Sequence, residues 1–177
     1  MKIIVCSLAR APAIIASERP SHVVSLLSPQ DIHLAAFDHA AERHLRLEMN
    51  DLREPGFNPG ETPPHEEHVA RLLDFARSWT SEAPILVHCW AGVSRSTAAA
   101  FTLACARNPH ADEADIAQAM RAASATAWPN PLLIGLADAA LGRNGRMLAA
   151  IEAIGAPEEF ESNMPFHLPA DFSAQPS

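Results

Sequence analysis

The sequence has few cysteines and few basic side chains, and it contains no tyrosine. Its 21 acidic residues outnumber its 13 basic residues and give a formal charge of −8. This balance argues against a protein that binds nucleic acid or an anionic membrane, since both partners require a positive surface. No apolar stretch approaches the ~20 residues that a helix needs to cross a bilayer. One local basic pocket for an anion stays compatible with the composition.

The three cysteines are Cys6, Cys89 and Cys105, and no two of them form a C-x-x-C pair. An odd and sparse count in a chain of this length predicts reduced thiols in a cytoplasmic protein rather than a disulfide framework. The N-terminal residues superficially resemble a signal peptide. However, Arg10 interrupts the apolar run, and the alternation over residues 2–8 fits a first strand equally well. The sequence therefore favours a protein that is not secreted.

The hydrophobic pattern predicts an α/β fold. Short apolar runs at residues 3–5, 23–27 and 85–88 are typical of buried strands, and residues 45–49 alternate like an edge strand. Helical patterns separate these runs, most clearly over residues 66–79, where the apolar side chains share one face. Strands separated by helices indicate a central, mostly parallel sheet of four to five strands flanked by helices.

The second half of the chain is predicted to be largely helical. Helices are expected over residues 95–107, 111–123, 131–141 and 143–154, and in part over residues 30–43. Asn130 provides an N-cap for the third of these, with Pro131 at its first position. We expect residues 1–155 to form a single domain and residues 156–177 to form a C-terminal tail that is partly disordered.

The strongest signal is His88-Cys89-Trp90-Ala91-Gly92-Val93-Ser94-Arg95-Ser96, which follows a predicted strand and opens a predicted helix. Five residues separate Cys89 from Arg95, enough to wrap a short loop around a tetrahedral anion. Backbone N–H groups can point inward, and the helix adds its positive N-terminal end. Gly92 tolerates a positive φ, and Arg95 can bind two phosphate oxygens at once. We therefore expect a phosphate-binding loop made of Trp90, Ala91, Gly92, Val93, Ser94 and Arg95.

The same surroundings suit Cys89 for nucleophilic attack. A thiol beside an arginine at a helix N-terminus loses its proton readily, and the thiolate can attack phosphorus to form a cysteinyl phosphate. Ser96 can donate a hydrogen bond to this sulfur, and His88 can brace the loop from its strand. Trp90 leaves two interpretations open, since it can line the mouth of the pocket or pack under the loop. This chemistry requires no metal ion and no cofactor.

These residues resemble the signature of the cysteine-based protein tyrosine phosphatase superfamily, which is His-Cys, five residues including a glycine, and Arg followed by Ser or Thr. The resemblance extends, with weaker motifs, to the small dual-specificity-like branch of bacterial type, from about His22 to Leu141. It includes the strand segment at residues 22–27 and the element Trp128-Pro129-Asn130. The first twenty residues and the tail match no part of the family.

The resemblance implies a general acid upstream of the cysteine, usually an aspartate on a separate loop, that protonates the leaving oxygen. Asp51 fits this position because it follows the third predicted strand and begins the loop at residues 53–64, which holds four prolines and two glycines. Asp38 and Glu54 are rival acids, although Asp38 precedes the third strand and Glu54 is less favoured by the family pattern. The structural alternative for Asp51 is a helix or turn cap.

Three functions are compatible with the sequence. The first is hydrolysis of a phosphorylated protein or a small phosphomonoester through a cysteinyl phosphate, with Asp51 acting as acid and then as base. The second is a catalytically weak phosphate-binding module, and the third is sulfur transfer of the rhodanese kind. The resemblance implies phosphotyrosine as the substrate group, alone or with phosphoserine and phosphothreonine. The absence of lysine and of a further arginine inside the loop disfavours polyphosphorylated inositol lipids.

Overall fold

The computed structural model describes residues 1–37, 43–54, 56, 59–80, 82–157 and 164–172, and its strands form one five-stranded sheet. The strands are β1 (Lys2–Ser7), β2 (His22–Leu27), β3 (Arg43–Glu48), β4 (Ile85–Cys89) and β5 (Phe166–Pro169). They lie in the order β3-β2-β4-β1-β5. The first four pair in parallel, and β5 pairs antiparallel with β1. This arrangement confirms the predicted α/β fold with a mostly parallel sheet, and it confirms β3 as an edge strand.

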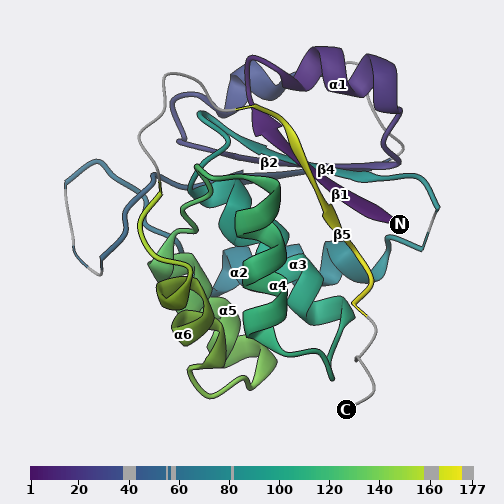
Figure 1. Ribbon diagram of the computed structural model, residues 1–177. Helices are drawn as coiled ribbons and strands as arrows, with labels where there is room; N and C mark the ends of the chain where they lie inside the picture. Colours follow the sequence, from purple (N-terminus) through teal and green to yellow (C-terminus); the bar gives the residue numbers. More distant parts are fainter. Residues whose placement is uncertain (38–42, 55, 57–58, 81, 158–163, 173–177) are drawn as a thin grey trace.

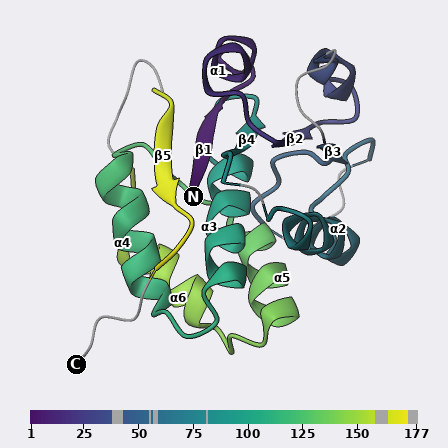
Figure 2. The same cartoon turned by 90° about the vertical axis from the view of Figure 1, so that its right-hand side faces the viewer.

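Helices cover both faces of the sheet unequally. They are α1 (Ala11–Glu18), the 3₁₀ helix η1 (Ile32–Ala35), α2 (Glu66–Arg77), α3 (Arg95–Arg107), α4 (Glu113–Ala123), α5 (Pro131–Leu141) and α6 (Arg146–Ala153). Figures 1 and 2 show α1 on one face and α2 to α6 on the other. Among the described helices, none combines the length and the apolar character needed to span a membrane.

The central strands are buried on both faces, which is why they are continuous apolar runs. Side chains alternate between the two sides of a strand. Ile3 and Val5 accordingly join the large core under α2 to α6, whereas Ile4 and Cys6 join a smaller core that includes Ala11 of α1. Parallel sheets with this double burial occur where helices cover both faces.

Helix α3 is the centre of the helical layer (Figure 2). Its residues from Arg95 to Cys105 are all buried, and it contacts β1, β2 and β4 as well as α2, α4 and α5. Alanines fill much of its length, at positions 98–100 and 104 among others. Small side chains allow neighbouring elements to approach the helix closely on every side. Because α3 is buried all round, its sequence lacks the polar stripe of an ordinary surface helix. The first turn of α3 is thereby held firmly against the end of β4.

The structure corrects two expectations and adds one helix. Helix α1 was not predicted, because its sequence APAIIASE has no polar face that would produce a helical period. The helix expected within residues 30–43 is limited to the short η1 among the described residues, and Arg43 already belongs to β3. Strand β5 lies in the segment expected to be an irregular tail. Partial disorder was expected somewhere within residues 156–177, of which 158–163 and 173–177 lie outside the described residues.

Candidate active site

The predicted loop lies at the carboxyl ends of the parallel strands, where open α/β sheets form their binding crevices. Strand β4 ends at Cys89, and the segment after β3 brings Met49 and Asp51 to the same edge. A cavity of about 350 Å³ opens there. It is lined by Asp51, Arg53, Cys89, Trp90, Ala91, Val93, Ser94, Arg95 and Trp128. Most of the residues predicted to act together therefore share one cavity.

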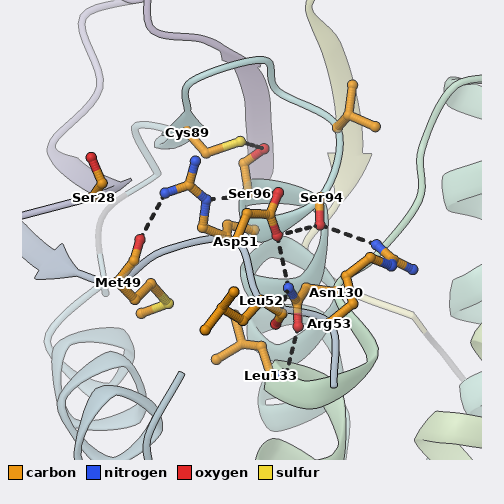
Figure 3. A network of polar contacts seen from close by, with 12 residues as sticks. Ser28, Met49, Asp51, Leu52, Arg53, Cys89, Ser94, Ser96, Asn130 and Leu133 are labelled. Atoms are coloured by element: carbon orange, nitrogen blue, oxygen red, sulfur yellow. Dashed lines mark hydrogen bonds and ion pairs between the residues drawn. The ribbon is translucent and has the colours of Figure 1, made fainter. Parts of the chain in front are cut away.

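The loop folds back over the sulfur of Cys89. Gly92 has a φ of +77°, a conformation that favours glycine, and its N–H donates to Cys89 Sγ at 3.2 Å. The Ser96 hydroxyl lies 3.1 Å from the same sulfur (Figure 3). Cys89 is only 2% exposed, so the thiol sits at the floor of the cavity and not at its mouth. The Gly92 N–H from the loop and the Ser96 hydroxyl from α3 thus converge on the sulfur.

Arg95 is held at the same floor. Its side chain is buried, and Nη1 donates to the carbonyl of Met49 at 2.7 Å. Within the described part of the chain, Nε makes no hydrogen bond, and it lies 3.9 Å from Asp51 Oδ2. A buried guanidinium with an N–H that makes no hydrogen bond is unusual, because a buried donor left without a partner costs free energy. We therefore expect this donor to bind an anion that occupies the cavity.

Ser94 occupies the N-cap position of α3 without capping it. Its side chain makes no cap hydrogen bond to the helix, although serine is among the preferred N-cap residues. Its hydroxyl donates instead to Asp51 Oδ1 at 2.7 Å. The first N–H groups of a helix have no intrahelical partner. The N-terminus of α3 therefore keeps the character of an anion-binding end.

Asp51 lines the cavity and is held there by two donors. Its Oδ1 accepts from Ser94 Oγ and from Asn130 Nδ2, each at 2.7 Å (Figure 3). The loop that begins here is closed at its base, because Asn50 and Thr62 exchange two hydrogen bonds. Asp51 caps no helix of the described residues. Glu54 does not line the cavity, and Asp38 lies outside the described residues.

Arg53 and Trp128 line the cavity although neither was predicted from the sequence as a site residue. The Arg53 guanidinium lies 3.8 Å from the centroid of the Trp128 ring and donates to Ser94 Oγ at 3.2 Å. Two further hydrogen bonds go from Arg53 to the carbonyls of Trp128 and Pro129. Partial burial lowers the pKa of Arg53 and the Asp51 charge opposes this, but arginine stays charged at neutral pH. Arg53 stands out in no sequence motif, and Trp128 belongs to an element of the family resemblance, but the contact between them appears only in the structure.

Two tryptophans stand at the mouth of the cavity. Trp90 is 55% exposed and Trp128 is 45% exposed, although both are large apolar side chains. Of the two interpretations for Trp90, its exposure and its place in the cavity wall favour the mouth of the pocket over packing under the loop. Exposed aromatic side chains beside a cavity are typical of ligand-binding sites.

His88 is buried beneath the loop and joined to a second histidine. Its Nε2 lies 2.6 Å from Ser25 Oγ, which also lies 2.8 Å from Nε2 of His44. One hydroxyl carries one proton, so one imidazole donates to Ser25 and the other accepts from it. Burial lowers the pKa of both His88 and His44 to about 4. A contact with the Cys89 backbone acts in the opposite direction and raises the His88 pKa, but its effect is smaller than that of burial. Among the described residues, His88 Nδ1 has no partner of normal hydrogen-bond geometry.

These buried histidines predict a loss of stability in mild acid. Their folded pKa of about 4 lies below the ordinary value of 6.5, so the unfolded chain binds more protons between these pH values. The free energy of unfolding should fall by up to about 1.4 kcal/mol per pH unit for each histidine as the pH drops from 6.5 to 4, with the steepest fall midway between these values. In His88→Gln this slope should become shallower by up to that amount, which urea unfolding at several pH values measures. An unchanged slope would contradict the assignment.

The other two cysteines belong to the core. Cys6 and Cys105 are fully buried, and burial raises the pKa of each thiol to about 12. Neither lines the cavity at the end of β4. In the part of the chain that the structure describes, no group of three or more His, Cys, Asp or Glu side chains could hold a metal ion.

This arrangement agrees with a family assignment made from the sequence. The protein-tyrosine phosphatase family model matches residues 31–126, which is more than half of the chain and includes β3, β4 and the whole loop. The chain belongs to the protein-tyrosine phosphatase family. That assignment confirms the resemblance carried by residues 88–96. Family membership also suggests phosphatase activity on phosphorylated substrates. No curated protein sequence matches the chain.

Solved structures of phosphatases share this fold at low sequence identity. A crystal structure of PTPMT1 is 13% identical, with a TM-score of 0.57 over 83% of this chain and 94% of that one. PTPMT1 in complex with PI(5)P gives a TM-score of 0.59 at 13% identity, over 80% and 90% of the two chains. The PTP-2 phosphatase of Cydia pomonella gives 0.57 at 18% identity, over 77% and 84%. These likenesses establish the architecture of the family in this chain.

Proposed function

We propose that this chain hydrolyses phosphate monoesters through a cysteinyl-phosphate intermediate on Cys89. The observation that carries the proposal is the cavity floor, where a thiol that accepts the Gly92 N–H lies beside a buried arginine with a spare donor. Positive groups at a helix N-terminus favour both a thiolate and a bound phosphate. In our proposal Arg95 and the loop amides of residues 90–95 hold the phosphoryl oxygens.

In the first step the Cys89 thiolate attacks phosphorus in line with the leaving oxygen. The S–P bond forms while the P–O bond to the leaving group breaks. Protonated Asp51 gives its proton to the departing oxygen. Because donors at the loop surround the equatorial oxygens throughout, the charge that develops on them is stabilised.

In the second step Asp51, now a carboxylate, takes a proton from water, whose oxygen attacks the cysteinyl phosphate. The S–P bond breaks and the thiolate is regenerated. Ser96 supports this step, because its hydroxyl lies 3.1 Å from the sulfur and can donate to the departing thiolate. His88 takes no part in proton transfer in this scheme, since it lies buried beneath the loop.

The alternatives differ from this proposal in what the acid does. A module that only binds phosphate would not need Asp51 at the cavity, whereas Asp51 lines it and is fixed by two hydrogen bonds. A sulfurtransferase of the rhodanese kind would not need an acid there either. The position of Asp51 therefore favours hydrolysis over both alternatives.

For the substrate we propose an aryl phosphate, with phosphotyrosine as the natural example. The two exposed tryptophans at the mouth can contact a ring bound to the phosphate, and aromatic pairs are worth about 0.5–1.5 kcal/mol beyond their buried area. PTPMT1 has been crystallised with PI(5)P. In the present chain, however, the described cations that line the cavity are Arg53 and Arg95 alone. A cavity with so few cations does not favour a polyphosphorylated inositol headgroup.

A substrate panel tests the proposal. We expect kcat/KM to be highest for a phosphotyrosine peptide, lower for the phosphoserine peptide of the same sequence, and negligible sulfur transfer from thiosulfate. Trp90→Ala should raise KM for the phosphotyrosine peptide by roughly 2-fold to 10-fold, because one aromatic contact is lost. It should change KM for the phosphoserine peptide by less than about 2-fold, since serine offers no ring.

Leu34→Ala is the matched control for this comparison. Leu34 is 45% exposed, like the tryptophans, but it does not line the cavity. Its replacement should leave both KM values unchanged. An equal rise of KM for both peptides in Trp90→Ala would contradict the ring contact, and thiosulfate sulfurtransferase activity above the phosphatase activity would contradict the proposed reaction.

A further inference from the structure

We propose that Asn130 is a positioning residue that holds Asp51 so that the outer carboxylate oxygen, Oδ2, carries the catalytic proton. The inference rests on the proposed function, because it concerns the acid of that reaction. It adds a residue outside the His-Cys to Arg-Ser segment and assigns the two oxygens of Asp51 different tasks. Figure 3 shows Asn130 and Ser94 reaching the carboxylate from two separate segments of the chain.

Every polar atom of the Asn130 side chain has a partner, and the side chain is fully buried. Its Nδ2 donates to Asp51 Oδ1 at 2.7 Å and to the carbonyl of Leu52 at 3.0 Å. Its Oδ1 accepts from the N–H of Leu133 at 3.0 Å, which is the N-cap contact of α5. A flipped amide would place its oxygen against two acceptors and its nitrogen against a donor. The orientation of the amide is therefore determined by its surroundings.

The segment that carries Asn130 is held rigidly, because it is hydrogen-bonded to the loop that carries Cys89. The backbone N–H groups of Trp128 and Asn130 donate to the carbonyls of Val93 and Ser94. Helix α5, which Asn130 caps, packs against α2 and α3. One short segment thus binds the loop through its backbone and the acid through its side chain. This connection sets the distance between the acid and the thiol.

The hydrogen bonds divide the two oxygens of Asp51. Both close donors, Asn130 Nδ2 and Ser94 Oγ, bind Oδ1. Ser94 can give its proton to Asp51 because its oxygen accepts from Arg53 Nη1 at 3.2 Å. Among the described residues Oδ2 makes no hydrogen bond, and it lies 3.9 Å from Arg95 Nε, which is beyond hydrogen-bond distance. An oxygen that already accepts two hydrogen bonds is a poor place for a further proton, so Oδ2 is the atom that holds and delivers it.

Asn130→Ser separates this role from that of the cap. Serine is a good N-cap residue, so α5 keeps its cap, but its side chain is too short to reach Asp51. The substrates are phenyl phosphate, whose poor leaving group needs a proton, and 4-nitrophenyl phosphate, whose good leaving group needs it little. We expect kcat for phenyl phosphate to fall by about 10-fold to 100-fold, because misplacement of a catalytic group by about 1 Å has effects of this size.

Three further measurements accompany this loss. We expect kcat for 4-nitrophenyl phosphate to fall less than 3-fold, KM to stay within about 2-fold for both substrates, and the rate of Cys89 alkylation by iodoacetate to stay unchanged. In an Asp51→Asn background, Asn130→Ser should lower kcat for phenyl phosphate by less than about a further 2-fold, since the group that Asn130 orients is already disabled. Asn130→Asp keeps both the cap and the side-chain length but loses the donor, and it should show the same dependence on the leaving group.

Several results would overturn the inference. Equal losses on both substrates, or a further large loss in the Asp51→Asn background, would mean that Asn130 supports the fold and does not orient the acid. Full activity on phenyl phosphate in both Asn130→Ser and Asn130→Asp would mean that Ser94 alone positions Asp51. If the wild-type protein hydrolyses neither substrate, the proposed function fails and this inference fails with it. In the first two cases the wild-type activity shows that the proposed function stands.

Discussion

Replacement of Cys89 by serine is expected to abolish the hydrolysis of aryl phosphates while leaving the phosphate-binding loop intact. The hydroxyl of serine stays protonated where a thiolate would form, so the attack on phosphorus is lost. Loss of a catalytic nucleophile typically lowers kcat by about 10⁴-fold or more. Serine is close in size to cysteine and can keep the contacts with Gly92 and Ser96. Steady-state kinetics with 4-nitrophenyl phosphate measures the loss, and calorimetry with a phosphotyrosine peptide measures binding.

Cys105→Ala provides the control for this experiment. Cys105 is also buried and also belongs to the segment around α3, but it lies far along the helix from the loop and does not line the cavity. Its replacement should leave kcat within about 2-fold of the wild-type value, because it removes a core thiol only. Turnover by Cys89→Ser at the wild-type rate would contradict the cysteinyl-phosphate mechanism. Loss of peptide binding together with turnover would indicate a collapsed loop.

Replacement of Asp51 by asparagine is expected to lower kcat by about 10²-fold to 10⁴-fold for phenyl phosphate, with KM changed only a few-fold. Asparagine can still accept from Ser94 through its side-chain oxygen, so the local structure is largely kept. It cannot deliver a proton to the leaving oxygen. The loss should shrink for 4-nitrophenyl phosphate, and the decline of kcat at high pH that a general acid produces should disappear from the pH profile.

Glu54→Gln tests the rival acid on the same loop. Glu54 lies three residues further along the chain and does not line the cavity, so its replacement should leave kcat and its pH profile unchanged. If Glu54→Gln showed the large loss and Asp51→Asn did not, Glu54 would be the acid and the inference about Asn130 would fail. Measuring both variants on the same pair of substrates separates these outcomes.

The parts of the site that could be predicted from the sequence are those made by neighbouring residues. The segment from His88 to Ser96 contains in one short stretch the thiol, the glycine turn, the arginine and the start of a helix. The N-cap at Asn130 also depends on residues three positions apart. Local spacing is enough for such features, because their geometry follows from backbone conformation alone.

The contacts of Asp51 could not be predicted in the same way. Its two hydrogen-bond donors, Ser94 and Asn130, lie 43 and 79 residues away in the chain. The place of Asp51 was inferred from family resemblance, and neither the contact of Asn130 with Asp51 nor the place of Arg53 in the cavity was expected. Asp51 and Ser94 meet because parallel strands bring the loop after β3 and the loop after β4 to one edge of the sheet. Asn130 joins them because the segment before α5 is hydrogen-bonded to the backbone of Val93 and Ser94.

The amino-acid sequence by itself determined the α/β class, the buried central strands and the chemistry of the loop around Cys89. The tertiary structure decided that residues 166–169 complete the sheet, that two tryptophans flank the cavity, and that one oxygen of Asp51 is occupied by donors while the other is not. The reason is physical. Periodicity and capping act over a few residues, whereas pairing at a sheet edge and the convergence of side chains depend on segments that only the packed core places together.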